Sequence, residues 1–159
     1  MHNEKVDILL IEGNDYEAKL ALHNLKKHNL TNNLLHLRDG EQAADYIFAT
    51  GEYEGRDISN RPKVVLLDIN LPKMNGMEIL KKIKSDERTR TIPVVILTSS
   101  RENRDVAEGY ALGANSYIVK PIEFGSFSET ITSLGLYWAI MNQEAPYIPN
   151  NLWQSISEA

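Results

Sequence analysis

Short runs of apolar residues recur along the chain and alternate with longer segments that have a helical period. Most of these runs are almost continuous in valine, isoleucine and leucine, which is typical of strands covered on both faces of a parallel sheet. We therefore expect five strands, at residues Val6–Ile11, Leu34–Leu37, Val64–Leu67, Ile92–Leu97 and Tyr117–Val119.

The segments between these runs have apolar residues three and four positions apart, a spacing that places side chains on one face of a helix. Strands that alternate with helices predict right-handed βαβ units and a doubly wound parallel sheet, so the fold class is α/β. The apolar positions are Ala18, Ala21, Leu22 and Leu25, then Ala43, Ala44 and Ile47, then Ile79, Leu80 and Ile83, and last Val106 and Tyr110.

Two helix starts are marked by the spacing of a capping box. In this arrangement a side-chain oxygen, and a carboxylate three residues later, satisfy backbone amides that the first turn leaves free. Asn14 with Glu17 has this spacing, and so does Ser99 with Glu102. We expect a helix to begin at each place.

Composition excludes several classes of function. The chain has 159 residues, of which 42% are apolar and 25% charged, as in an ordinary globular domain. Its formal net charge of -5 lacks the basic surplus of nucleic-acid-binding proteins, so we expect no nucleic-acid partner. Without cysteine there is no disulfide, thiolate nucleophile or zinc–thiolate site. Neither a signal peptide nor a membrane-length apolar run is present, so we expect a cytoplasmic protein with no membrane partner.

Polar residues that can take part in chemistry lie at the ends of four of the predicted strands. Ligands of open parallel sheets bind outside the carboxyl ends of the strands, so these residues are expected to share one cleft. Such a set suits phosphoryl transfer onto an aspartate, because carboxylates hold Mg²⁺ while an ammonium and a hydroxyl contact the phosphoryl oxygens. The residues are Glu12 after the first strand, Asp68 and Asn70 after the third, Thr98 at the fourth and Lys120 at the fifth.

Each of these residues alone has a common structural explanation. A strand-end aspartate often caps a helix or forms a turn, and a lone lysine is usually solvated. Four such residues at four strand ends are better explained by a functional cleft. The histidines are scattered along the chain, and we expect none of them beside this cleft: His2, His23, His28 and His36.

Four segments carry these strand ends: VDILLIE at residues 6–12, LDINLPKMNG at 67–76, IPVVILT at 92–98 and YIVKP at 117–121. In order and spacing they resemble the receiver domain of two-component response regulators. An elongated loop with Gly-Glu-Tyr and a last helix with Leu-Gly-Leu-Tyr-Trp are similar to the stand-alone regulators that work with phytochromes and related sensor kinases. The resemblance implies a flavodoxin-like (βα)5 fold with a five-stranded sheet, a receiver domain at residues 1–142 and a C-terminal tail at residues 143–159.

The resemblance implies a single-domain response regulator in a phosphorelay, a switch rather than an enzyme. Asp68 would accept phosphate from a sensor histidine kinase, for example one of the phytochrome type. Thr98 and Lys120 would contact the phosphoryl group. Glu12, Asp68 and the backbone carbonyl of Asn70 would hold the cofactor Mg²⁺.

The resemblance also implies how the signal would leave the site. Thr98 and Tyr117 would form a switch pair, in which the hydroxyl is drawn toward the phosphate and the aromatic ring turns inward behind it. A cis peptide bond would join Lys120 to Pro121.

One residue departs from the family pattern. Receiver domains have an acidic pair after the first strand, whereas this chain has Glu12 followed by Gly13, so one direct metal ligand is missing. Asp15 could fold back to replace it, although an acid in a first turn is explained by the helix dipole, and Glu12 could coordinate the metal directly. A phosphorylation-independent receiver, which acts only as an interaction module, therefore stays open as the alternative.

A phosphatase of the haloacid-dehalogenase type would also use a strand-end aspartate with Mg²⁺. Enzymes of that class carry an Asp-x-Asp motif at this position, in which the second aspartate donates the proton to the leaving group. Here the second position is Asn70, so this chain lacks the proton donor. We therefore expect Asp68 to act as a phosphoacceptor without phosphatase turnover.

The last predicted helix is apolar on more than one face, which indicates burial on more than one side. One face can pack on the sheet, and the second predicts a homodimer with Phe127, Tyr137 and Trp138 at the interface. The alternative is that the tail folds back and covers this face. The first stripe is Phe127, Ile131, Leu134, Trp138 and Met141, and the second is Leu136, Tyr137 and Ile140.

Overall fold

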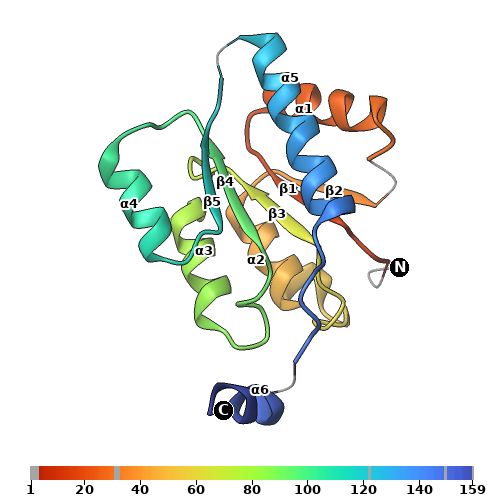
Figure 1. Ribbon diagram of the computed structural model, residues 1–159, viewed down its shortest axis with the longest axis vertical. Coiled ribbons are helices and arrows are strands. Elements are labelled where there is room, and N and C mark those ends of the chain that lie inside the picture. Colours follow the sequence, from red (N-terminus) through yellow and green to blue (C-terminus); the bar gives the residue numbers. More distant parts are fainter. Residues whose placement is uncertain (1–3, 31–32, 122, 149, 159) are drawn as a thin grey trace.

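The five apolar runs form one parallel sheet in the order β2-β1-β3-β4-β5 (Figure 1). This confirms the doubly wound parallel sheet that the alternation of strands and helices predicts, and the flavodoxin-like fold that the family resemblance implies. The computed structural model describes residues 4–30, 33–121, 123–148 and 150–158. The strands are β1 (Ile8–Ile11), β2 (Leu34–Leu37), β3 (Val64–Leu67), β4 (Val94–Thr98) and β5 (Ser116–Val119).

Helices cover both faces of the sheet, with α1 and α5 on one face and α2, α3 and α4 on the other (Figure 1). A short 3-10 turn, η1, follows α2, and a π-helical segment, η2, extends α5. None of the helices in the described ranges is long and apolar enough to cross a membrane. The helices are α1 (Asp15–Lys27), α2 (Gly40–Phe48), η1 (Gly51–Tyr53), α3 (Gly76–Ser85), α4 (Asn103–Ala111), α5 (Phe124–Gly135), η2 (Leu136–Met141) and α6 (Asn150–Ser157).

The central strands are buried on both faces, which explains their unbroken apolar sequence. Every residue of β1, β3 and β4 is buried, whereas the four residues of the edge strand β5 are only half-buried. Four strand boundaries differ from the prediction, two of them by a single residue, since β4 ends at Thr98 and β5 begins at Ser116. β1 begins at Ile8 rather than Val6, and β4 begins at Val94, directly after Pro93, which has no N–H to donate to a neighbouring strand.

One of the two predicted helix starts is confirmed. The Asn14 side chain accepts a hydrogen bond from the Glu17 N–H and caps α1. The predicted start at Ser99 is wrong, because α4 begins only at Asn103 and Glu102 makes no side-chain cap there. In that loop Ser100, rather than Ser99, makes the local contact, through a hydrogen bond to the side chain of Asp105.

Helix α4 approaches the sheet through Gly109 rather than through the predicted apolar pair. Val106 is half-buried and Tyr110 is exposed, so the expected apolar face is only partly formed. A Cβ on Gly109 would lie 2.8 Å from Ile96 Cδ1 and 3.2 Å from the ring of Tyr117. The absence of a side chain at this position therefore lets α4 lie close to β4 and β5.

Two buried arginines hold the long connection between α2 and β3. Arg56 donates hydrogen bonds to the backbone carbonyls of Tyr46 (2.9 Å) and Asn60, and its guanidinium lies 4.1 Å from the centroid of the Tyr46 ring. Arg61 donates to the Thr91 hydroxyl at 2.5 Å. These contacts fix the conformation of the polar loop between α2 and β3.

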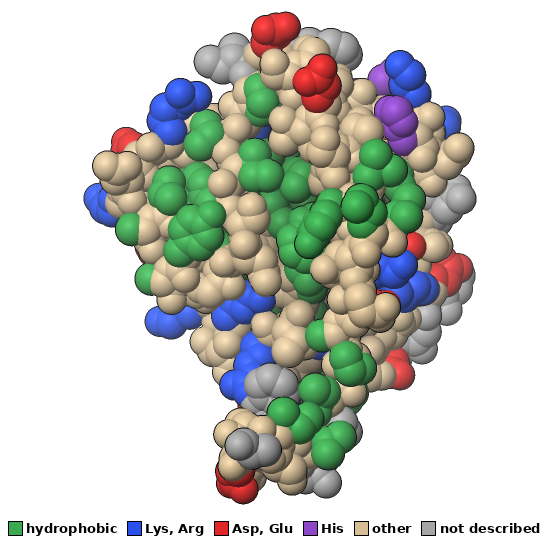
Figure 2. Space-filling view, viewed as in Figure 1, with side chains coloured by type: hydrophobic (Ala, Val, Ile, Leu, Met, Phe, Trp, Pro, Cys, Tyr) green, Lys and Arg blue, Asp and Glu red, His purple; other side chains and the backbone are tan. Residues whose placement is uncertain are grey.

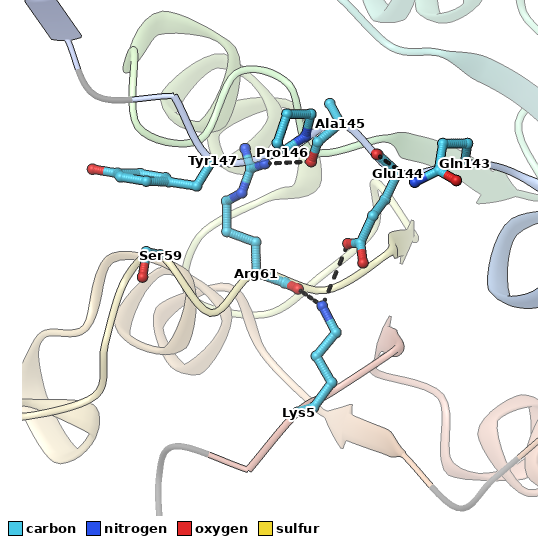
Figure 3. Close-up of a pocket in the computed structure, with 8 residues that line it drawn as sticks. All are labelled: Lys5, Ser59, Arg61, Gln143, Glu144, Ala145, Pro146 and Tyr147. Atoms are coloured by element: carbon cyan, nitrogen blue, oxygen red, sulfur yellow. Dashed lines mark hydrogen bonds and ion pairs between the residues drawn. The ribbon is translucent and has the colours of Figure 1, made fainter. Parts of the chain in front are cut away.

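Arg61 also holds the start of the C-terminal tail. It donates to the Ala145 carbonyl at 2.8 Å, and its guanidinium lies 5.7 Å from the centroid of the Tyr147 ring, while Lys5 pairs with Glu144 at 3.4 Å (Figure 3). Helix α6 then lies apart from the sheet (Figure 1). The described part of the tail therefore does not fold back over the second apolar stripe, whose residues Leu136, Tyr137 and Ile140 are exposed.

Gly76 brings the start of α3 against the end of β3. A Cβ on Gly76 would lie 2.4 Å from the carbonyl oxygen of Asp68 and 2.6 Å from the Cα of Ile69, both backbone atoms. Because these atoms cannot move aside without shifting the loop that carries Asp68, we predict that Gly76→Ala lowers the free energy of unfolding by about 1–3 kcal/mol. Urea denaturation followed by circular dichroism measures this change.

Gly125 in the first turn of α5 provides the matched control, since among the described residues a Cβ there would meet only the Glu123 side chain, at 3.6 Å. We expect Gly125→Ala to be neutral or to stabilise the protein by up to about 1 kcal/mol, the difference in helix propensity. Equal stabilities of Gly76→Ala and wild type would contradict the close approach of α3 to β3.

Candidate functional site

Three buried charged side chains meet at the carboxyl ends of the strands. Glu12 follows β1, Asp68 follows β3 and Lys120 follows β5, and all three are buried. The Lys120 ammonium donates to Glu12 Oε1 at 2.6 Å and to Asp68 Oδ2 at 2.8 Å. The structure therefore brings together these three predicted site residues in one cleft.

A third carboxylate reaches the same ammonium from α1. Glu17 Oε2 lies 2.6 Å from Lys120 Nζ, and the Glu17 side chain is 34% exposed. The capping box that we predicted is only half formed, since the Asn14 N–H is bonded to Glu12 Oε2 (3.2 Å) rather than to Glu17. The sequence did carry a signal for this third acid, because Glu17 lies in the first turn of a helix that begins at a functional strand end.

The charges in this cleft are unbalanced. Burial lowers the pKa of Lys120, but its hydrogen bonds to Asp68, Glu12 and Glu17 outweigh this effect, so its pKa lies above the ordinary lysine value. Burial raises the pKa of Glu12 to about 7, against the opposing effect of Lys120. Glu12, Glu17 and Asp68 each offer one carboxylate oxygen, and these oxygens lie within 4.8 Å of one another.

This surplus of carboxylates favours a bound cation. Two like charges about 4 Å apart repel by about 4 kcal/mol at an effective dielectric near 20. One ammonium faces three carboxylates here, so a second cation would relieve the remaining repulsion. Carboxylate oxygens are the ligands that Mg²⁺ and related hard divalent ions prefer, so the donor set fits such an ion.

The backbone and Thr98 complete the cleft around Asp68. Asn70 donates its backbone N–H to Asp68 Oδ1 at 3.0 Å, and its own side chain is exposed. Thr98 ends β4, is fully buried, and accepts the Lys120 N–H on its carbonyl at 2.7 Å. Its hydroxyl has no hydrogen-bond partner among the described residues. Because an unpaired buried polar group costs about 1–3 kcal/mol, this hydroxyl is suited to bond a ligand oxygen.

Tyr117 lies on β5 next to the cleft. Its ring is half-buried, and its hydroxyl donates to the Ser100 carbonyl at 2.9 Å in the loop between β4 and α4. The expected cis bond after Lys120 is wrong, because Pro121 follows it through a trans bond. Trans is the form that most bonds before proline adopt, and Lys120 reaches the carboxylates with this geometry.

The loop after β1 brings no further acid into the cleft. A Cβ on Gly13 would lie 3.1 Å from Pro72 Cδ and 3.2 Å from the Arg38 carbonyl oxygen, so this wall consists of backbone and proline. Asp15 does not fold back into the cleft. Its carboxylate pairs with Arg38 Nε at 3.2 Å, and both side chains are about two-thirds exposed.

One histidine does lie beside the cleft, contrary to our expectation. His36 on β2 has its Nε2 atom 2.9 Å from the Glu12 carbonyl oxygen. The parallel register pairs Leu10 with His36, which carries the imidazole to the end of the neighbouring strand. Sequence reasoning missed this contact because it depends on which strands are neighbours.

The last helix divides into a core face and an exposed face. Phe127 is buried in the core with Ile131 and Leu134, so it does not lie on the surface as the predicted interface requires. Trp138 is half-buried, whereas Tyr137 is 48% exposed. Figure 2 shows hydrophobic side chains gathered over this end of α5, η2 and the neighbouring part of β5.

Comparison with known proteins gives one family. Residues 8–132 match the response regulator receiver domain. The probable methanogenesis regulatory protein FilR2 of Methanothrix harundinacea is 39% identical over 136 residues, which are 86% of this chain and 85% of that protein.

Two solved structures are similar over most of this chain. The Mn(2+)-bound response regulator Rcp1, a protein of Synechocystis, is 34% identical with a TM-score of 0.81, over 89% of this chain and 99% of that one. The phosphorylated cyanobacterial phytochrome response regulator RcpA is 31% identical with a TM-score of 0.80, over the same shares of the two chains, 89% and 99%. The sheet order, the charged cleft and these matches together show that the chain belongs to the response regulator receiver domain family.

Proposed function

We propose that Asp68 is the phosphoacceptor of this response regulator and that it receives its phosphoryl group from a histidine of a sensor kinase. The observation that carries the proposal is the setting of the Asp68 carboxylate. One oxygen accepts the Asn70 N–H at 3.0 Å and the other accepts the Lys120 ammonium at 2.8 Å. A carboxylate fixed in this way at a strand end is oriented for in-line attack.

In the transfer, a carboxylate oxygen of Asp68 forms a bond to phosphorus while the phosphorus–nitrogen bond of the kinase phosphohistidine breaks. The electron pair of that bond returns to the imidazole. Lys120 neutralises charge on the phosphoryl oxygens, and the unpaired Thr98 hydroxyl donates a hydrogen bond to one of them.

Glu12, Asp68 and the backbone carbonyl of Asn70 would hold a divalent ion, for which we propose Mg²⁺. Such an ion supplies positive charge to the phosphoryl oxygens and keeps several of its waters. The surplus of carboxylates over ammonium groups in the cleft supports this assignment.

Two competing functions are less well supported. A phosphatase would need a proton donor two residues after the nucleophile, where this chain has Asn70. A phosphorylation-independent receiver would need none of the cleft chemistry, yet Lys120, the carboxylates around it and an unpaired hydroxyl at Thr98 are all retained. We therefore propose a phosphoacceptor switch without phosphatase turnover.

We further propose that Thr98 and Tyr117 transmit the state of Asp68. A phosphoryl group would draw the Thr98 hydroxyl toward itself, since that hydroxyl has no other partner among the described residues. The Tyr117 hydroxyl would then leave the Ser100 carbonyl, and the ring would move closer to β4. This movement would change the surface formed by α4, β5 and α5.

The partners we propose are a sensor histidine kinase and a second copy of this chain. The phytochrome named for RcpA supports a kinase of that type. The exposed apolar face near the end of α5 supports a homodimer that uses Tyr137 and Trp138, beside a groove of about 550 Å³ that also includes Ile118. The acidic net charge argues against a nucleic-acid partner.

The first prediction of this proposal concerns the phosphoacceptor. Incubation with acetyl phosphate and Mg²⁺ should add one phosphoryl group to the wild-type protein, because Asp68 is oriented and Lys120 supplies the counter-charge. Intact-mass spectrometry measures the adduct. Asp68→Asn should show none, since an amide cannot accept the group.

Gly13→Asp tests whether the natural cleft is competent. It restores the acid of the family pattern, and Gly13→Ala controls for the crowding that any side chain meets there. An adduct on Gly13→Asp together with none on wild type would show that the natural site does not accept phosphate.

The dimer is tested by sedimentation velocity at micromolar concentration. Wild type should sediment as a dimer and Tyr137→Glu as a monomer, because the new charge would be buried without a partner in the interface. Tyr16→Glu, at a tyrosine that is 69% exposed on α1, should leave the dimer intact. A wild-type monomer, or a dimer that persists in Tyr137→Glu, would contradict the proposed dimer interface.

A further inference from the structure

The metal site of this receiver is one carboxylate short at the loop after β1. Gly13 has no side chain, and the next acid along the chain, Asp15 at the start of α1, pairs with Arg38 in solvent. Loss of a charged ligand should weaken a site in which few protein groups bind the ion. The question is therefore whether another side chain in the cleft supplies the missing oxygen.

Glu17 is placed to do so, because its backbone is fixed in the helix cap while its carboxylate is left for the cleft. Its backbone N–H is bonded to Asn14 Oδ1 at 3.0 Å, which fixes the first turn of α1 against the cleft. The carboxylate is not used in the helix cap, because the Asn14 N–H is satisfied by Glu12. It extends instead to Lys120, where it lies among the other cleft acids.

The spacing of the carboxylates suits a single ion. Oxygens bound to one Mg²⁺ at about 2.1 Å lie at most about 4.2 Å apart. Oxygens of Glu12, Glu17 and Asp68 lie within 4.8 Å of one another, slightly wider than this limit. All three carboxylates already contact one cation, the Lys120 ammonium. The unpaired, buried Thr98 hydroxyl is a separate sign that this cleft receives a ligand.

We propose that Glu17 supplies the carboxylate that Gly13 lacks, so that the divalent ion of this chain is held by Glu12, Glu17, Asp68 and the backbone carbonyl of Asn70. The ligand then comes from the first turn of α1 rather than from the loop after β1. This inference rests on the proposed function, because it assigns a ligand to the same metal site. It explains how the chain can keep a metal-dependent phosphoacceptor without the second acid of the family pattern.

The test is direct binding of Mn²⁺ to the full chain, followed by the electron paramagnetic resonance signal of the free ion. Glu17→Gln removes the charge and one strong ligand oxygen while keeping the side-chain length. We expect it to weaken binding by about tenfold or more, since even the loss of an outer partner of a ligand costs roughly 10–100-fold. Asp15→Asn is the matched control, because it removes an acid from the same helical turn and should leave binding unchanged.

Gly13→Asp in the Glu17→Gln background should recover binding, and thermal unfolding checks that each variant is folded. Equal affinities of Glu17→Gln and wild type would overturn the proposal while leaving the proposed phosphoacceptor intact. Equal losses in Glu17→Gln and Asp15→Asn would also overturn it, since they would show a general effect of charge. If wild type binds no Mn²⁺ at all, the metal-dependent function and this proposal fail together.

Discussion

The site depends on the hydrogen bonds that the Lys120 ammonium makes to three carboxylates. It donates to Glu12, Glu17 and Asp68 at 2.6, 2.6 and 2.8 Å, and so joins the ends of β1 and β3 and the start of α1. Removing one member of a buried ion cluster typically costs about 3–5 kcal/mol, because the remaining charges are left uncompensated. The cluster that we propose as the site of the chemistry therefore also ties four elements of the fold together, β1, β3, β5 and α1.

The topology explains why these groups can meet. β1 and β3 are neighbours, so Glu12 and Asp68 leave the sheet side by side, and the Asp68 N–H is bonded to the Ile11 carbonyl. β5 lies two strands from β3, with β4 between them. Only a long side chain at the end of β5 can reach the carboxylates from there, and Lys120 has that length. Thr98 ends the strand in between, which places a hydroxyl next to the charged groups.

Apolar periodicity was sufficient to predict the α/β class and the doubly wound parallel sheet, because a strand covered on both faces needs an unbroken apolar run. The rule that parallel sheets bind ligands at their carboxyl ends was sufficient to select Asp68 and Lys120. Glu17 was missed as a member of the cleft because a local explanation, the capping box, already accounted for it. His36 and Phe127 were misplaced for a related reason, since neighbouring strands and helix packing decide their surroundings. Contacts of this kind arise only when distant segments meet.

The central claim is that the carboxyl ends of the strands form a metal-dependent phosphoacceptor site around Asp68. Crystals soaked in Mn²⁺ test it most directly, through anomalous density recorded near the manganese absorption edge. The account predicts one peak in the cleft, bound by the carboxylates of Asp68, Glu12 and Glu17. A cleft without a peak at saturating Mn²⁺, or an ion bound only elsewhere on the surface, would contradict it.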